Sequence, residues 1–88
     1  MDLMRILVAT RALKDPAGSE TYAATVVGAL RQLGHDVPVY APVGGEMADR
    51  LRASGAEVHH DLRTIDPPDV AHVQHGSTCL RVRARFPE

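Results

Sequence analysis

The loop over residues 10–19 is the first segment whose residue types could do chemistry. Its sequence, TRALKDPAGS, ends in Ala17, Gly18 and Ser19, and an apolar stripe at helical spacing follows. A glycine beside a helix N-terminus lets backbone N–H groups approach a phosphate, and the helix dipole favours the negative charge. The Ser19 hydroxyl could equally act as a helix N-cap. The three residues are therefore candidates for an anion site, and a helix cap without a ligand is the simpler interpretation.

The histidines form a second group, and His75 is the one best placed to meet a ligand. It ends an expected strand at residues 69–75, where an imidazole can bind a hydroxyl or phosphate, or transfer a proton. The turn that it forms with Gly76 and Ser77 is the second candidate site. His72 lies in mid-strand and is interpreted as a hydrogen-bonded core residue. Because strand neighbours three apart point to opposite faces, these two histidines cannot chelate one ion, and no metal site is expected.

Two further groups near the end of the chain have simpler interpretations. Cys79 lies at helical spacing with Val82 and Phe86, which predicts core packing and no nucleophile. The densest basic cluster is interpreted as a solvated face whose charges suit a helix C-terminus. This cluster comprises Arg81, Arg83 and Arg85.

Composition limits the classes of partner. The 88 residues suffice for one small domain, and 44% apolar with 24% charged residues is typical of a globular protein. A net charge of −1 gives no electrostatic case for nucleic acid or an anionic membrane. The single cysteine, Cys79, excludes an internal disulfide and suits a reducing compartment. No run reaches transmembrane length and the first residues do not match a signal peptide, so a cytoplasmic location is expected.

The elements that must position these residues alternate in the order strand, helix, strand, helix, strand, strand, helix. This order predicts an α/β fold: a Rossmann-like three-layer half-domain with a parallel sheet in the strand order 3-2-1-4. In that order a crevice opens above the carboxyl ends of the first and fourth strands, between the loop 10–19 and the turn His75–Ser77. The expected strands cover residues 3–9, 35–42, 56–59 and 69–75, the expected helices lie between Ser19 and Gly34, over 46–54 and from Ser77 to Phe86, and 61–68 is expected as an irregular connection.

Several common uses of such a fold are excluded by missing motifs. No G-x-G-x-x-G follows the first strand, and no acidic residue ends the second, so a dinucleotide fingerprint is absent. The P-loop pattern is absent as well. The first strand also ends without the acidic cluster that would hold magnesium in a receiver domain. No cofactor is therefore expected.

The order of the short motifs along the chain resembles the beginning of GT-B glycosyltransferases. The resemblance is to the large retaining family that includes sucrose synthases and phosphatidylinositol mannosyltransferases. Those proteins typically open with a strand, a G-G-x-E type loop and helix, a G-H-E-V-like second strand and a P-D-V-V-H-like fourth strand. The matching residues here are Gly18 and Glu20, then Gly34, His35 and Val37, then Pro68, Asp69, Val70 and His72.

The resemblance implies that residues 1–88 are a truncated amino-terminal, acceptor-side Rossmann-like domain of such an enzyme. The partners would be a nucleotide-sugar donor and an acceptor in the full-length enzyme. The loop residues Ala17, Gly18 and Ser19 would face the donor phosphates, and His75 to Ser77 would border the acceptor cleft. Ala17 replaces the first glycine of the family's pair. The catalytic residues stay unknown, and the donor-binding domain with its E-x7-E motif is absent from these residues, so they are expected to be inactive alone.

A second hypothesis of another class is a small non-catalytic α/β binding or assembly module. A parallel sheet that ends at its fourth strand has an unpaired edge and incomplete cover, and such edges recruit partners. Both hypotheses therefore predict a homo-oligomer formed through the sheet edge or the incomplete core.

Overall fold

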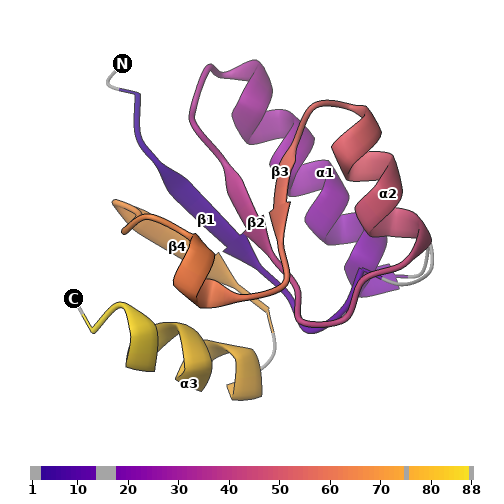
Figure 1. Cartoon of the computed structure of the whole chain (residues 1–88). Helices are drawn as coiled ribbons and strands as arrows, with labels where there is room; N and C mark the ends of the chain where they lie inside the picture. Colours follow the sequence, from indigo (N-terminus) through magenta and orange to yellow (C-terminus); the bar gives the residue numbers. More distant parts are fainter. Residues whose placement is uncertain (1–2, 14–17, 75, 88) are drawn as a thin grey trace.

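The sheet is built as the sequence order predicts. The computed structural model describes residues 3–13, 18–74 and 76–87. Four parallel strands form one sheet in the order β3-β2-β1-β4, which confirms the α/β class and the 3-2-1-4 order (Figure 1). The elements are β1 (Ile6–Ala9), α1 (Gly18–Gln32), β2 (Pro38–Tyr40), α2 (Glu46–Ala53), β3 (Glu57–His59), the 3₁₀ turn η1 (Leu62–Thr64), β4 (Val70–Val73) and α3 (Gly76–Arg85).

The boundaries of several elements differ from those expected. Each strand is shorter, and η1 forms within the expected connection because the Asp61 carboxylate accepts a hydrogen bond of 2.9 Å from the Arg63 N–H. Helices α1 and α3 begin one residue before Ser19 and Ser77. The expected helix starts at Ser19 and Ser77 were therefore one residue late. The residues that directly precede the two helices, Ala17 and His75, lie outside the described part of the chain.

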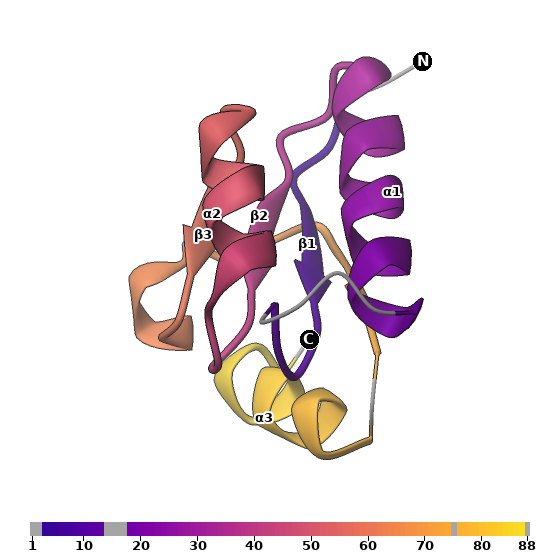
Figure 2. The same cartoon turned by 90° about the vertical axis from the view of Figure 1, so that its right-hand side faces the viewer.

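The sheet separates two apolar clusters because successive side chains of a strand point to opposite faces. Val8 packs with residues of α1 and α2, whereas Leu7 and Ala9 pack against Ile65 and Val82 on the other face. Figure 1 shows α1 and α2 on one side of the sheet and α3 on the other, and Figure 2 shows α1 and α2 side by side.

Helix α3 covers its face only in part. Val82 is buried in the second cluster and Phe86 is partly buried there. Cys79 lies on the same helical stripe but is exposed, so its predicted core position was wrong. The helix packs mainly against β1 and η1.

Glycines at the helix ends allow the chain to reverse. Gly34 follows α1 with φ of 91°, and Gly55 follows α2 with φ of 97°. This left-handed conformation strains other residues, so the predicted stop at Gly34 is confirmed. Gly44 has a different requirement: a Cβ there would stand 2.6 Å from Cε1 of the His60 ring. The ring is fixed in that place by a 2.6 Å contact between its Nδ1 and the Ala41 carbonyl oxygen.

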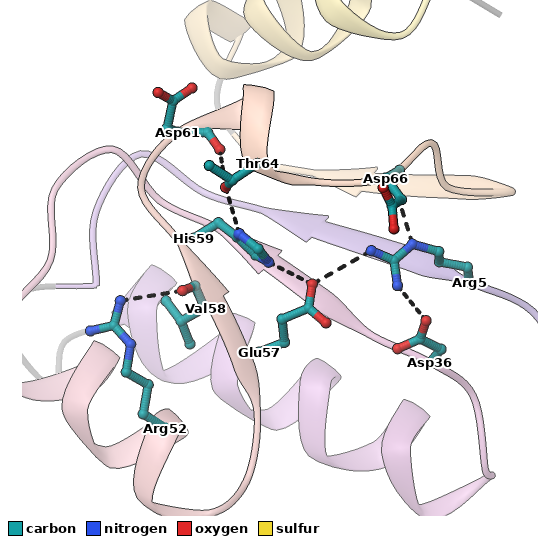
Figure 3. Close-up of polar contacts among 9 residues, drawn as sticks. All are labelled: Arg5, Asp36, Arg52, Glu57, Val58, His59, Asp61, Thr64 and Asp66. Carbon is teal, nitrogen blue, oxygen red and sulfur yellow. Dashed lines mark hydrogen bonds and ion pairs between the residues drawn. The ribbon is translucent and has the colours of Figure 1, made fainter.

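Arg5 contacts residues at the amino ends of the other three strands. These contacts explain why a charged residue stands in an otherwise apolar run. Its N–H donates to the Asp69 carboxylate at 2.9 Å, and its Nε donates to the Asp66 carbonyl oxygen at 3.4 Å. The guanidinium pairs with the carboxylates of Asp36 and Glu57 (Figure 3). Burial lowers the pKa of Arg5, but hydrogen bonding to Asp36 and the surrounding negative charge raise it above its ordinary value.

Candidate functional site

The candidate site lies at the carboxyl ends of β1 and β4, where the direction of the chain across the sheet reverses. The two strands pair from Ile6 and Val70 to Ala9 and Val73. The backbone pairing continues one residue further, because Gln74 N–H donates to the Ala9 carbonyl oxygen at 2.9 Å. In open α/β sheets, the crevice above such a point is the usual place for a ligand.

Three buried polar atoms near this edge have no hydrogen-bond partner, and the described residues contain no others of this kind. They are Thr10 Oγ1, His72 Nε2 and Gln74 Oε1. Leaving a buried polar group unpaired costs about 1–3 kcal/mol, so native structures keep few of them. We call Thr10, His72 and Gln74 the polar trio.

The polar trio lies on the face of the sheet that α1 covers. Val8 packs towards α1, and its register partner on β4 is His72. Thr10 and Gln74 stand two residues further along their strands and therefore point to the same face. The His72 ring lies 6.1 Å from the ring of Tyr22 in α1, centroid to centroid. The three unpartnered atoms thus lie on the face of the sheet that α1 covers, at the carboxyl ends of β1 and β4.

The residues predicted to bind ligand lie around this edge as far as the structure describes them. Helix α1 returns the chain to the amino edge, where Asp36 N–H donates to the Met4 carbonyl oxygen, so α1 must begin at the carboxyl edge. Gly18 and Ser19 are its first residues. Gly76 and Ser77 open α3 directly after β4. The N-terminal ends of α1 and α3 therefore both lie at the carboxyl edge of the sheet. Ala17 and His75 fall outside the described residues.

Sequence reasoning proposed a site at this edge but did not include the polar trio. His72 was interpreted as a hydrogen-bonded core residue, whereas it is only half-buried and its Nε2 has no partner. Thr10 and Gln74 were not proposed as binding residues. Each is a polar residue directly after a strand, two positions beyond a residue whose side chain points to the face that α1 covers. Side chains alternate between the two faces along a strand, so this spacing is the signal that could have indicated Thr10 and Gln74.

The chemistry of the trio is that of neutral hydrogen bonding. A hydroxyl, an imidazole and an amide can each donate to or accept from hydroxyl groups of a ligand. Among the described residues, no group of three or more histidine, cysteine, aspartate or glutamate side chains is arranged to hold a metal ion. The first turn of α1 adds a partial positive charge beside these neutral groups. This edge can therefore bind a polyhydroxylated ligand that bears an anionic group.

A second polar cluster joins β3 to η1. Its hydrogen bonds form a chain like that of a proton relay, but their role is structural. His59 lies between Glu57 Oε2, 2.5 Å from its Nε2, and Thr64 Oγ1, 2.6 Å from its Nδ1 (Figure 3). The Thr64 hydroxyl donates its one hydrogen to the Asp61 carbonyl oxygen at 2.7 Å. His59 therefore cannot take that proton, and it must donate its own Nδ1 hydrogen to Thr64. The cluster fastens η1 to β3.

The one carboxyl group whose pKa is clearly shifted, among the described residues, belongs to Asp61. Hydrogen bonds from the Arg63 side chain and backbone lower the pKa of Asp61 to about 2. This carboxylate caps η1 on the β3 side of the sheet and is separate from the polar trio.

No protein-family model, no curated protein and no solved structure matches this chain. Within the described ranges, no helix has the length and apolar character needed to cross a membrane.

Proposed function

We propose that this chain is the amino-terminal, acceptor-side part of a retaining GT-B glycosyltransferase, which transfers a sugar from a nucleotide-sugar donor to an acceptor. The observation that carries the proposal is the polar trio of Thr10, His72 and Gln74, three unpartnered polar groups on one face beside the switch point of the sheet. The order of the sequence motifs supplies the particular family.

A nucleotide-sugar offers hydroxyl groups that suit the polar trio and a diphosphate that suits the start of α1. Sugar hydroxyls donate and accept hydrogen bonds, so they would satisfy the hydroxyl, imidazole and amide of the trio without burying a charge. The donor diphosphate would meet free backbone N–H groups at residues 17–19, where the helix dipole favours negative charge. Residues 75–77 would border the acceptor on the other side of the crevice.

The 88 residues should not catalyse transfer by themselves. No two glutamates of the chain have the E-x7-E spacing of the family's donor-binding domain. We therefore expect binding of ligand fragments without turnover, and we infer that the protein works in the cytoplasm, where nucleotide-sugars and reduced cysteines are found. Steady transfer of sugar by the purified 88-residue chain would contradict this part of the proposal.

Binding can be tested by titrating the ¹⁵N-labelled chain separately with uridine diphosphate and with glucose. Uridine diphosphate should shift the amide signals of residues 17–19, and glucose those of Thr10 and Gln74. The Thr10→Val variant should weaken the response to glucose, whereas Thr25→Val, which changes an exposed threonine of α1, should leave it unchanged. The absence of any shift at these positions at millimolar ligand would refute the proposal.

A non-catalytic assembly module is the second candidate, and the exposed edge of the sheet favours it. Val70 on the edge strand β4 is 47% exposed although it is a large apolar residue. Unpaired edges of this kind recruit further strands. Sedimentation velocity over a wide concentration range separates the cases, because a self-associating module should give a growing dimer fraction. A constant monomer would contradict self-association.

A further inference from the structure

A groove runs between β4 and α3, on the face of the sheet opposite the polar trio. It has a volume of about 330 Å³. One wall is formed by a single stripe of α3, which contributes Cys79, Val82, Arg83 and Phe86. The other wall is β4, including Ala71 and Val73. An adjoining hollow of about 380 Å³ lies between Pro67, Pro68, Arg85, Phe86 and Pro87. The groove is open because α3 packs beneath β1 and η1 and contacts β4 only sparsely.

The backbone of β4 presents unpaired groups along this groove. Val70 N–H donates to the Arg5 carbonyl oxygen at 3.4 Å, and Gln74 N–H donates to the Ala9 carbonyl oxygen at 2.9 Å. The N–H groups of a strand in a parallel pair point alternately to its two sides. Those of Ala71 and Val73 therefore point away from β1. No strand lies beyond β4 among the described residues, so these groups are free to pair with an added strand.

The described residues around the groove carry mainly positive charge. Arg83 lines the groove and Arg85 lines the adjoining hollow, and Arg81 stands exposed on the same helix. None of the three forms an ion pair with a carboxylate of the described residues. The Arg85 guanidinium instead stacks on the Phe86 ring, 4.7 Å from its centroid. The one carboxylate of the groove, Asp69, already accepts from the Arg5 N–H.

These charges favour an acidic strand over a second copy of the chain as the occupant. Two β4 edges paired about a twofold axis would keep both α3 helices on the same face of the joined sheet. The two arginine sets would then lie on one face on either side of the junction, where their like charges repel. An acidic strand meets the same charges favourably.

We propose that the β4–α3 groove binds an acidic protein segment in extended conformation, which adds to the sheet as a fifth strand beside β4. Its backbone pairs with the outward groups of Ala71 and Val73, as in other cases of strand addition. Apolar side chains on one face of the added strand enter the groove, and its carboxylates meet the guanidiniums of Arg83 and Arg85. This interaction uses the β4 edge and the face of the sheet opposite the polar trio, so its test is separate from the test of the sugar-transfer proposal.

A designed peptide tests the proposal directly. The probe is a fluorescent heptapeptide of alternating glutamate and valine, and the matched control peptide has lysine in place of glutamate. The full chain should bind the glutamate peptide and not the lysine peptide, with amide shifts at Ala71 and Val73. Ala71→Pro removes an outward N–H without breaking a bond to β1, and prolines are tolerated at such edges. It should weaken binding about tenfold, whereas Ala71→Val, which keeps the N–H, should not.

Charge reversal gives a second, independent readout. Arg83→Glu should weaken binding of the glutamate peptide about fivefold or more at low salt and should improve binding of the lysine peptide. Arg50→Glu makes the same change of net charge on α2, across the sheet, and should have little effect. Equal binding of both peptides, no binding at millimolar peptide, or shifts confined to other elements would each overturn the proposal. A concentration-dependent dimer that Ala71→Pro abolishes would also overturn it, because the occupant would then be a second copy.

Discussion

Replacing Thr10 by valine tests whether the polar trio is kept for a ligand. Thr10 is fully buried, and its Oγ1 has no hydrogen-bond partner. Valine has the same β-branched shape and replaces the hydroxyl with a methyl group. An unpaired buried hydroxyl costs about 1–3 kcal/mol, and its removal therefore recovers part of that cost. We expect Thr10→Val to raise the free energy of unfolding by about 1 kcal/mol and the melting temperature by about 4–8 °C.

The measurement is urea unfolding followed by circular dichroism, with the slope m unchanged so that the midpoint reports stability. Thr25→Val is the matched control, since the Thr25 hydroxyl is exposed and donates to the Thr21 carbonyl oxygen at 3.0 Å. We expect that variant to change the unfolding free energy by less than about 0.5 kcal/mol. A ligand-binding hydroxyl predicts opposite effects at Thr10: greater stability and weaker glucose binding. A loss of stability of about 1 kcal/mol or more in Thr10→Val would refute the reasoning, because it would mean that the hydroxyl is satisfied in the native state.

Three further predictions concern stability. Gly44→Ala should destabilise the fold by about 1–3 kcal/mol because its methyl group would meet the His60 ring, whereas Gly28→Ala, with open space on α1, should stabilise it by about 0.5–1 kcal/mol; equal urea midpoints would contradict this contrast. Arg5→Met should cost about 1–2 kcal/mol because it removes the ion pairs with two exposed carboxylates and the hydrogen bond to Asp66, and an unchanged midpoint would argue against this network. Asp61 has a lowered folded pKa, so its contribution to stability is present above about pH 4 and is lost as the pH falls through about 2. The melting temperature of Asp61→Asn should therefore fall less than that of the parent chain between pH 5 and pH 2, and parallel curves would contradict the assignment.

Much of the fold follows from local patterns that the sequence displays. The apolar run at Ile6–Ala9 requires cover on both faces, and all four residues are buried. Gly34 and Gly55 end helices in the left-handed conformation that other residues avoid. Short, right-handed crossovers favour the strand order 3-2-1-4, which is the order that forms. These features depend on neighbouring residues, and a sequence contains that information directly.

The individual binding groups depend on contacts between distant segments. The polar trio exists because the register between β1 and β4 brings His72 beside Val8, and no local pattern specifies that register. The same holds for Arg5, whose partners Asp36 and Glu57 are 31 and 52 residues away. Cys79 shows the limit of helical periodicity: the stripe that it shares with Val82 was correctly identified, but periodicity does not say how far the sheet covers it.

The sequence by itself thus determined the class of fold and the strand order, because these follow from periodicity, glycine positions and chain connectivity. The edge at which a ligand would lie stays a prediction from the same connectivity. Only the tertiary structure decided which polar atoms are left unpartnered at that edge and that a positively charged groove opens between β4 and α3. The physical reason is that both depend on strand register and on the distance between packed elements. These are set by the sum of many long-range contacts and by no single segment of the chain.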